Sequence, residues 1–212
     1  MESAKLYYQD GSPFSRLCRT LIIDWELPVE TIELDWPLNE SIFKENPLGQ
    51  VPTLGARVEA GETHLLDVPT SQITEQLLAM TFEPLAPYFD PLADRQLLIT
   101  ILSMGDAMIA SNAIDRSGLK QTEKNTYGID ILNRNEMRVN HTLAWLEGQC
   151  DKWLIDDRVS VCDYALACLL LWSDSRSPFN WRQYTKITRI VEELSYSDSF
   201  AQTVPNPWVP QD

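Results

Sequence analysis

A chain of 212 residues, 44% of them hydrophobic, is long enough to bury a core, which excludes a disordered protein. Its formal net charge of −14 would repel the phosphates of nucleic acids and the surface of anionic membranes. Lys and Arg form no sequence cluster that would offset this charge, so we expect no nucleic acid and no membrane as a partner.

The first eighty residues follow an alternating pattern of strands and helices. Alternating or continuous apolar runs between turn residues predict strands at 5–8, 29–34, 51–58 and 63–66. Apolar residues at helical spacing predict one helix that starts at Ser12 and Pro13 and another over 71–80. The first helix brings the second strand parallel to the first, and the last two strands form a hairpin. This order predicts an α/β domain over residues 1–80.

The rest of the chain is predicted to be helical. Three prolines between residues 81 and 91 indicate a linker between domains. Beyond it, apolar residues recur at helical spacing over 97–108, 132–146 and 184–194. The segment 161–172 is apolar nearly all round, so we expect it to be the buried centre of a helical bundle. The sequence thus predicts an all-α domain over residues 92–212.

Cysteine usage and the first residues favour a cytoplasmic protein. The cysteines have no metal-like spacing, and three of the four lie in apolar or helical stretches that are typical of reduced, buried thiols. The start, MESAKLYYQDG, has no basic leader, and we expect no later segment to span a membrane. The two histidines lie far apart, so we expect no metal site and no Ser-His-Asp arrangement.

Three motifs together resemble the soluble glutathione transferases over essentially the whole chain. They are SPFSRLCR at 12–19, NPLGQVPTL at 46–54 and WLIDDRVSVCDYAL at 153–166. The first is similar to the start of the first helix in the serine-type classes, theta, zeta and phi. The resemblance implies a thioredoxin-like domain that binds glutathione, followed by a helical domain that contributes the second-substrate site.

The third motif has a structural interpretation of its own. Ser160 and Asp163 have the spacing of a capping box, in which each side chain bonds the backbone amide of the other residue. We therefore predict that this pair starts the central helix of the bundle and has a folding role.

The second motif places a proline at the start of a strand. Such a proline marks an edge or a cis turn, although an ordinary loop proline is the alternative. The resemblance implies a cis bond between Val51 and Pro52, with the Val51 backbone pairing with the cysteinyl part of glutathione. It also implies that Gln50 contacts the glycyl end, whereas otherwise Gln50 is a solvated loop residue.

The first motif supplies the candidate catalytic residue, Ser12. A helix N-terminus favours negative charge, and a serine hydroxyl there can donate to a thiolate and lower the pKa of the thiol. The alternative is that Ser12 only caps the helix, with Pro13 at its first position. Ser15 is the runner-up, and Tyr8 is a further alternative because tyrosine-type classes exist. The neighbouring arginines, 16 and 19, are interpreted as solvated.

The segment before the 71–80 helix departs from the family pattern. The family has an acidic residue followed by serine for the γ-glutamyl end of glutathione, and here the pair is Thr70 and Ser71. Thr70 cannot neutralise the ammonium group, and Asp67 replaces the acid only if the intervening loop folds back. Ser71 can cap the helix, hold the γ-glutamyl carboxylate, or do both.

The leading hypothesis is a homodimeric transferase with glutathione as co-substrate. Glutathione would attack a hydrophobic electrophile held against the helical domain, by conjugation, isomerisation or peroxide reduction. In this fold the first domain of one subunit packs on the helical domain of its twofold partner. The alternative is a non-catalytic protein of the same fold that binds another protein or regulates it. A disulfide or dehydroascorbate reductase is disfavoured because serine stands where those classes have cysteine.

Overall fold

The computed structural model describes residues 4–35, 38, 40, 42–57, 64–67, 69–81, 91–117, 130–155, 157–176 and 179–207. Its contacts divide the chain into two compact units. The first comprises Met1–Pro87 together with Ser195–Asp212, and the second is Tyr88–Leu194.

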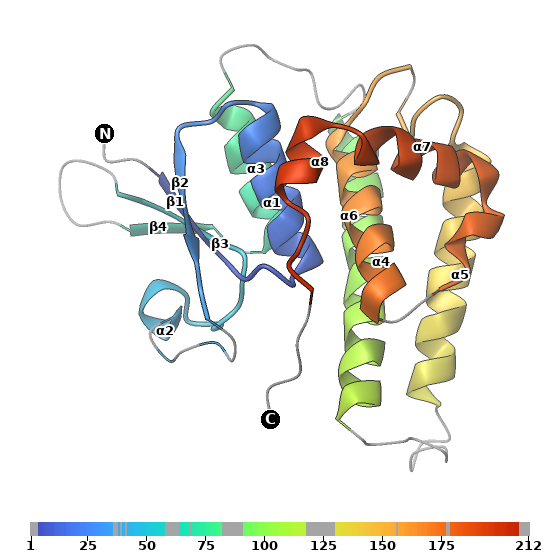
Figure 1. Cartoon of the computed structure of the whole chain (residues 1–212), viewed down its shortest axis with the longest axis horizontal. Helices are drawn as coiled ribbons and strands as arrows, with labels where there is room; N and C mark the ends of the chain where they lie inside the picture. Colours follow the sequence, from blue (N-terminus) through green and yellow to red (C-terminus); the bar gives the residue numbers. More distant parts are fainter. Residues whose placement is uncertain are drawn as a thin grey trace. The chain divides into compact units, whose positions relative to one another are not determined.

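A four-stranded sheet forms the centre of the first unit (Figure 1). Its strands are β1 (Ala4–Tyr8), β2 (Val29–Glu33), β3 (Thr53–Arg57) and β4 (His64–Asp67), in the order β2-β1-β3-β4. β1 is parallel to β2 and antiparallel to β3, which is antiparallel to β4. All four predicted strands are present. β3 begins two residues later than predicted, because a proline at position 52 has no N–H to join the ladder.

Two helices of the first unit, α1 (Pro13–Asp24) and α3 (Thr70–Ala79), pack against each other on one face of the sheet (Figure 1). Leucine and isoleucine side chains four residues apart form their buried faces, Leu17 and Leu21 on α1 and Ile73 and Leu77 on α3. This confirms the predicted α/β arrangement of strands, crossover helix and closing helix.

The first unit also contains two short helices that the sequence pattern did not predict, α2 (Ile42–Glu45) and α8 (Asp198–Gln202). With four and five residues, each is too short to repeat an apolar position at helical spacing. The sequence placed the C-terminal residues in the helical domain, whereas their contacts group them with the first unit, where α8 packs against α1.

The second unit is helical, as predicted. It contains α4 (Pro91–Arg116), α5 (Ile131–Gln149), α6 (Val161–Arg176), a 3-10 turn η1 (Trp181–Gln183) and α7 (Thr185–Ser195), whose last residue falls in the first unit. α4 packs against both α5 and α6. Every residue from position 161 to position 170 of α6 is buried, which confirms that this helix is the centre of the bundle.

The start of α6 is held by Asp163, whose side chain is fully buried. Its carboxylate accepts hydrogen bonds from the Ser160 N–H (2.8 Å), the Ser160 hydroxyl (2.6 Å) and the Leu154 N–H (2.9 Å). The predicted capping pair therefore forms, but the Ser160 hydroxyl donates to the carboxylate instead of accepting from the Asp163 amide. That amide donates to the Ser160 carbonyl oxygen at 3.1 Å.

The expectation that no segment could span a membrane was wrong for α4 by length and composition alone. The segment Leu92–Arg116 contains an 18-residue window of mean hydropathy 1.6, which is long and apolar enough to cross a bilayer. A core helix of a bundle passes the same test. Because α4 packs against α5 and α6 and buries Leu98, Ile101 and Met108, we interpret it as a bundle helix.

Candidate functional site

The register of the sheet brings three segments of the first unit to one edge. Tyr7 pairs with Thr53, so the end of β1 lies beside the start of β3. Leu54 pairs with Asp67, so the end of β4 lies beside the start of β3 as well. The loop after β1, the turn before β3 and the segment after β4 consequently meet at the same edge, outside the carboxyl ends of β1 and β4.

Two helices start at this edge, because α1 follows β1 and α3 follows β4. The first turn of a helix has unpaired N–H groups and the positive end of the helix dipole. α1 has no acidic residue in its first turn, and neither has α3. The edge is therefore suited to carboxylates and thiolates.

Ser12 is the N-cap of α1, and Pro13 occupies the first helical position, as predicted. The Ser12 backbone is extended (φ −87°, ψ 123°), and its Oγ accepts a hydrogen bond from the Ser15 N–H at 3.2 Å. A serine hydroxyl has one donor and two acceptor positions, so this bond leaves the proton available. Capping and donation to a ligand are consequently compatible roles for this half-buried residue.

The two alternatives to Ser12 are engaged within the protein. Ser15 is fully buried, and its Oγ accepts from the Gln9 N–H at 3.4 Å. Tyr8 is also buried, and its hydroxyl donates to a Glu33 carboxylate oxygen at 3.1 Å. Burial raises the pKa of the Tyr8 hydroxyl. Neither side chain is as accessible to a ligand as that of Ser12.

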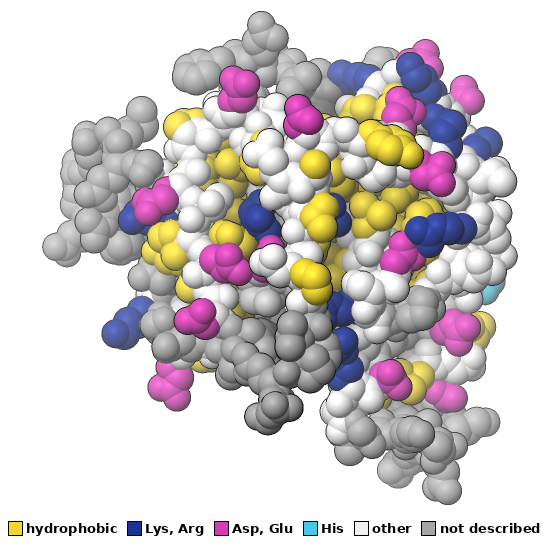
Figure 2. Space-filling view, viewed as in Figure 1, with side chains coloured by type: hydrophobic (Ala, Val, Ile, Leu, Met, Phe, Trp, Pro, Cys, Tyr) yellow, Lys and Arg dark blue, Asp and Glu magenta, His cyan; other side chains and the backbone are white. Residues whose placement is uncertain are grey.

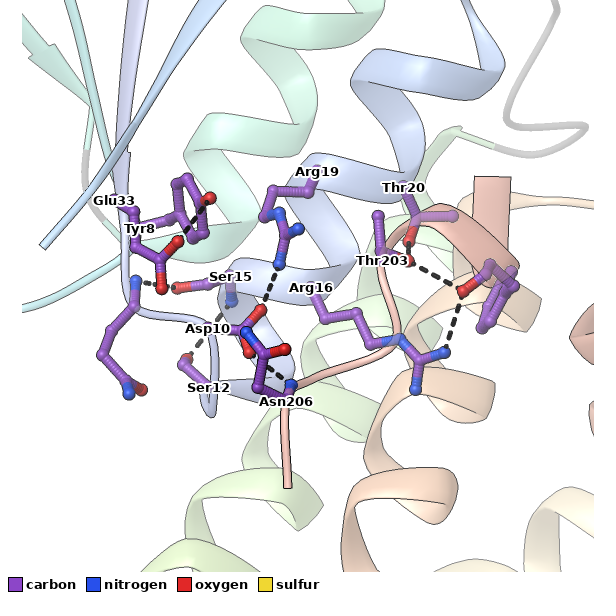
Figure 3. Close-up of polar contacts among 12 residues, drawn as sticks. Tyr8, Asp10, Ser12, Ser15, Arg16, Arg19, Thr20, Glu33, Thr203 and Asn206 are labelled. Carbon is purple, nitrogen blue, oxygen red and sulfur yellow. Dashed lines mark hydrogen bonds and ion pairs between the residues drawn. The ribbon is translucent and has the colours of Figure 1, made fainter. Parts of the chain in front are cut away.

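The arginines of α1 are not solvated, contrary to the sequence-based interpretation. Only 6% of Arg16 is exposed, and its guanidinium donates to the Phe200 carbonyl oxygen at 3.2 Å. Arg19 lies over the Tyr8 ring, 4.4 Å from its centre, and forms an ion pair with Asp10 at 2.8 Å (Figure 3). Their partners come from distant parts of the sequence or from the loop before α1, and helical periodicity does not reveal such partners.

The Val51-Pro52 peptide bond is cis, as the sequence motif implied. Pro52 is buried, Val51 is half-buried and Gln50 is exposed. These three residues immediately precede β3 and therefore lie at the candidate edge of the sheet.

Asn46 holds the turn before β3 and is a residue that the sequence reasoning missed. Its Nδ2 donates to the Gln50 carbonyl oxygen at 3.0 Å and to Thr53 Oγ1 at 2.9 Å. Its Oδ1 accepts from the Leu48 N–H at 2.8 Å, and its side chain is fully buried. The sequence signal for it is an asparagine in a loop that contains proline and glycine. In such loops an asparagine side chain often accepts a hydrogen bond from the backbone N–H two residues further on.

The start of α3 differs from the expectation for Ser71. The helix begins at Thr70 with Pro69 as N-cap, and no side chain caps it, so the expected capping role of Ser71 was wrong. Pro69 has an extended backbone (φ −82°, ψ −174°), which places the helix boundary one residue earlier than predicted. Thr70 is buried and Ser71 is half-buried. Asp67 is the last residue of β4, and its side chain lies outside the described part of the structure.

In the part of the chain that the structure describes, no three His, Cys, Asp or Glu side chains lie close enough together to hold a metal ion. All four cysteines are buried and outside any disulfide. Burial raises the pKa of Cys150 to about 11 and also raises the pKa of Cys162.

No protein-family model matches the chain, and no curated protein sequence matches it. Solved structures match nearly all of it. A glutathione S-transferase from Methylobacterium radiotolerans, in complex with glutathione sulfonate, superposes with a TM-score of 0.79 at 23% identity, covering 99% of this chain and 98% of that one. A glutathione S-transferase from Methylobacillus flagellatus with GSH bound superposes with a TM-score of 0.79 at 22% identity, covering 96% of this chain and 100% of that one. FzlA from C. crescentus superposes with a TM-score of 0.75 at 20% identity, covering 97% of this chain and 93% of that one.

The chain has the glutathione transferase fold. The thioredoxin-like sheet of the first unit and the helical second unit are the two parts that this fold predicts, and both are present. The likeness lies below 25% identity, so it establishes the fold and leaves the serine-type class a prediction.

Within the glutathione transferase fold, the structure brings most of the predicted site residues to one edge. The register places Ser12, the turn 50–52 and the pair 70–71 there. It also adds Asp10, which no sequence motif indicated and whose carboxylate pairs with Arg19. The roles of these residues toward a ligand remain a prediction.

Proposed function

We propose that this protein binds glutathione at the sheet edge defined by Ser12, Val51-Pro52 and Thr70, and activates its thiol for attack on an electrophilic small molecule. The observation that carries the proposal is the cap of α1: the Ser12 hydroxyl accepts from the Ser15 amide and retains its proton for a ligand sulfur. Two structures of the same fold contain glutathione sulfonate or GSH, which supports this ligand class.

Each part of glutathione has a partner in this proposal. Ser12 donates to the sulfur, and the dipole of α1 favours the thiolate. The backbone of Val51 pairs with the cysteinyl unit, and Gln50 contacts the glycyl end. The N-terminus of α3, with Thr70 and Ser71, holds the γ-glutamyl carboxylate. Asp67, at the end of β4, is the candidate for the charge that neutralises the ligand's ammonium group, a role that requires the loop before α3 to fold back.

The finer assignments form part of the same proposal. The protein is a cytoplasmic transferase of a serine-type class, with residues 1–80 as the glutathione-binding domain and 81–91 as the linker. The helical domain, which begins at residue 92, contributes the site for a hydrophobic electrophile. Conjugation, isomerisation and peroxide reduction all begin with the same activated thiol, so all three are candidate reactions.

One observation favours the alternative of a non-catalytic protein with this fold. Thr70 is buried and uncharged, so the first residue of α3 offers no carboxylate to an ammonium group. A buried or partly buried cation without a partner binds poorly. A protein that retains the fold but binds glutathione weakly would fit a role in recognising another protein.

We also propose that two copies form a twofold dimer. α4 has apolar residues that its own unit leaves uncovered, since only 39% of its most apolar window is buried. Leu92, Ile99 and Trp145 are exposed, and a hollow of about 540 Å³ lies along α4 and α5. The first unit exposes Phe43 (58%) near the turn before β3. The exposed apolar residues of one copy would cover those of the other.

Retention on immobilised glutathione tests the binding part of the proposal. We expect the protein to be retained and to elute with free glutathione, whereas free cysteine or free glutamate should not elute it. Binding without turnover of an aryl halide or a peroxide would favour the non-catalytic alternative. A protein that is not retained and gives no binding heat with millimolar glutathione would contradict the proposal.

A further inference from the structure

One face of α1 is polar and yet buried. Arg16 and Thr20 lie four residues apart, so they share a face of the helix, and the exposed Asp24 continues the same line at the end of α1. Arg16 is 6% exposed and Thr20 is fully buried. Buried polar side chains need hydrogen-bond partners, so something must cover this face and match it.

The C-terminal segment 197–206, which we name the strap, provides these partners. Ser199 Oγ donates to Asp24 at 3.2 Å, and the hydroxyls of Thr203 and Thr20 are 2.9 Å apart. Arg16 donates to the Phe200 carbonyl oxygen at 3.2 Å. Residue 199 contacts the end of α1 and residue 203 contacts its middle, so the strap runs antiparallel to the helix.

The strap reaches the loop that carries Ser12. The Asn206 N–H donates to Asp10 Oδ2 at 2.6 Å, while Arg19 pairs with Asp10 Oδ1 at 2.8 Å (Figure 3). Only 12% of the Asp10 side chain is exposed. Asp10 lies within the turn in which the Ser12 N–H donates to the Gln9 carbonyl oxygen at 3.1 Å. One carboxylate thus ties this turn to α1 on one side and to the strap on the other.

We propose that Asp10 is a positioning residue and that the strap acts through it to hold the Ser12 hydroxyl at the candidate thiol site. This inference rests on the proposed role of Ser12. Both carboxylate oxygens of Asp10 carry a charge-assisted hydrogen bond, and such bonds are among the stronger ones in proteins. Losing the Asn206 donor leaves one oxygen of a largely buried carboxylate unpaired, and the turn between β1 and α1 then relaxes.

A matched pair of variants at one position tests the strap. Asn206→Pro removes the backbone N–H, whereas Asn206→Ala keeps it and removes only the side chain. In Asn206→Pro we expect the thiol pKa of bound glutathione to rise toward its value in free glutathione. We also expect kcat with a small aryl halide to fall about 5- to 10-fold with KM little changed, as for one lost hydrogen bond. Asn206→Ala should retain the wild-type thiol pKa.

Amide hydrogen exchange gives a second measurement that needs no ligand. We expect the Ser12 amide to exchange about 10-fold faster in Asn206→Pro than in Asn206→Ala, as for the loss of roughly one hydrogen bond. Equal exchange and an equal thiol pKa in the two variants would overturn the inference. If Asn206→Pro fails to fold, Asp10→Asn, which weakens both contacts, must show the same changes. If the wild-type protein binds no glutathione, the proposed function fails, while exchange at Ser12 still decides whether the strap holds the turn.

Discussion

The Ser12 hydroxyl illustrates how one side chain can serve both the fold and a reaction. It accepts the Ser15 N–H, as any good N-cap does, and this bond uses only a lone pair. The hydroxyl proton stays available for donation to a ligand sulfur, whose thiolate form is also favoured by the positive end of the α1 dipole. A serine at this position therefore costs the helix nothing when it also donates to a ligand.

The cysteines give a prediction at the same scale. All four are buried, and burial raises the pKa of Cys150 to about 11 and also raises the pKa of Cys162. Because the thiolate is the reactive form, we expect the native protein at pH 8 to react slowly with an aromatic disulfide reagent. The absorbance of the released thiol should show four reactive groups only after unfolding. Rapid reaction of one or more thiols in the native protein would contradict this and would reopen a disulfide-exchange mechanism.

The turn before β3 gives a prediction at the scale of elements. Asn46→Ala removes a fully buried side chain that donates to the Gln50 carbonyl oxygen and to Thr53 Oγ1 and accepts from the Leu48 N–H. We expect the free energy of unfolding, measured with urea, to fall by about 2 to 3 kcal/mol. Glutathione binding should weaken as well, because the network fixes the turn that carries Val51.

Gln50→Ala is the matched control for the Asn46 variant. Gln50 is exposed, and the substitution keeps the carbonyl oxygen that Asn46 binds. Stability should change by less than about 0.5 kcal/mol, as for most surface substitutions. If Asn46→Ala were as stable as Gln50→Ala, the network would not be holding the turn.

Elements with long apolar repeats could be predicted from the sequence, and short or polar ones could not. The buried run of α6 and the four strands were predicted because their apolar periods extend over several residues. α2 and α8 were missed because four or five residues cannot repeat an apolar position at the helical period of 3.6, whereas the period of two in a strand fits within the same length. The start of α3 was misjudged because Ser71 is a good capping residue by type, whereas Pro69 sets the boundary.

The site was only partly predictable for a related reason. Motifs indicated Ser12 and the proline turn, but their meeting at one edge depends on the pairing of Tyr7 with Thr53. Asp10 and Asn206 are 196 positions apart, and no local pattern links them. Likewise, the partner of Arg16 could not be predicted, because the Phe200 carbonyl is a backbone group that sequence patterns do not mark.

At the scale of the whole molecule, the net charge of −14 opposes self-association. On the face visible in Figure 2, acidic side chains are scattered among basic ones and do not form a single patch. A dimer must therefore rest on apolar contacts such as the exposed residues of α4 and α5. We expect light scattering at micromolar concentration to give twice the 24.3 kDa monomer mass.

Paired variants locate the dimer surface. Trp145→Glu places a charge among the exposed apolar residues and should return the mass to that of the monomer. Tyr196 lies outside α4 and α5, between α7 and α8, and is 87% exposed, so Tyr196→Glu should leave the dimer intact. A wild-type protein that is monomeric at these concentrations, or a Trp145→Glu variant that stays dimeric, would refute this surface.

The pKa of the bound thiol in Ser12→Ala tests the central claim most directly, and it is followed by thiolate absorbance against pH. In the wild-type protein we expect this pKa to lie below that of a free thiol, about 8.5. In Ser12→Ala it should rise toward that value, with glutathione affinity nearly unchanged and aryl-halide turnover reduced roughly 10- to 100-fold. Loss of the cap should also lower stability by about 1 kcal/mol. A destabilised Ser12→Ala variant with an unshifted thiol pKa and unaltered turnover would show that Ser12 is only a helix cap.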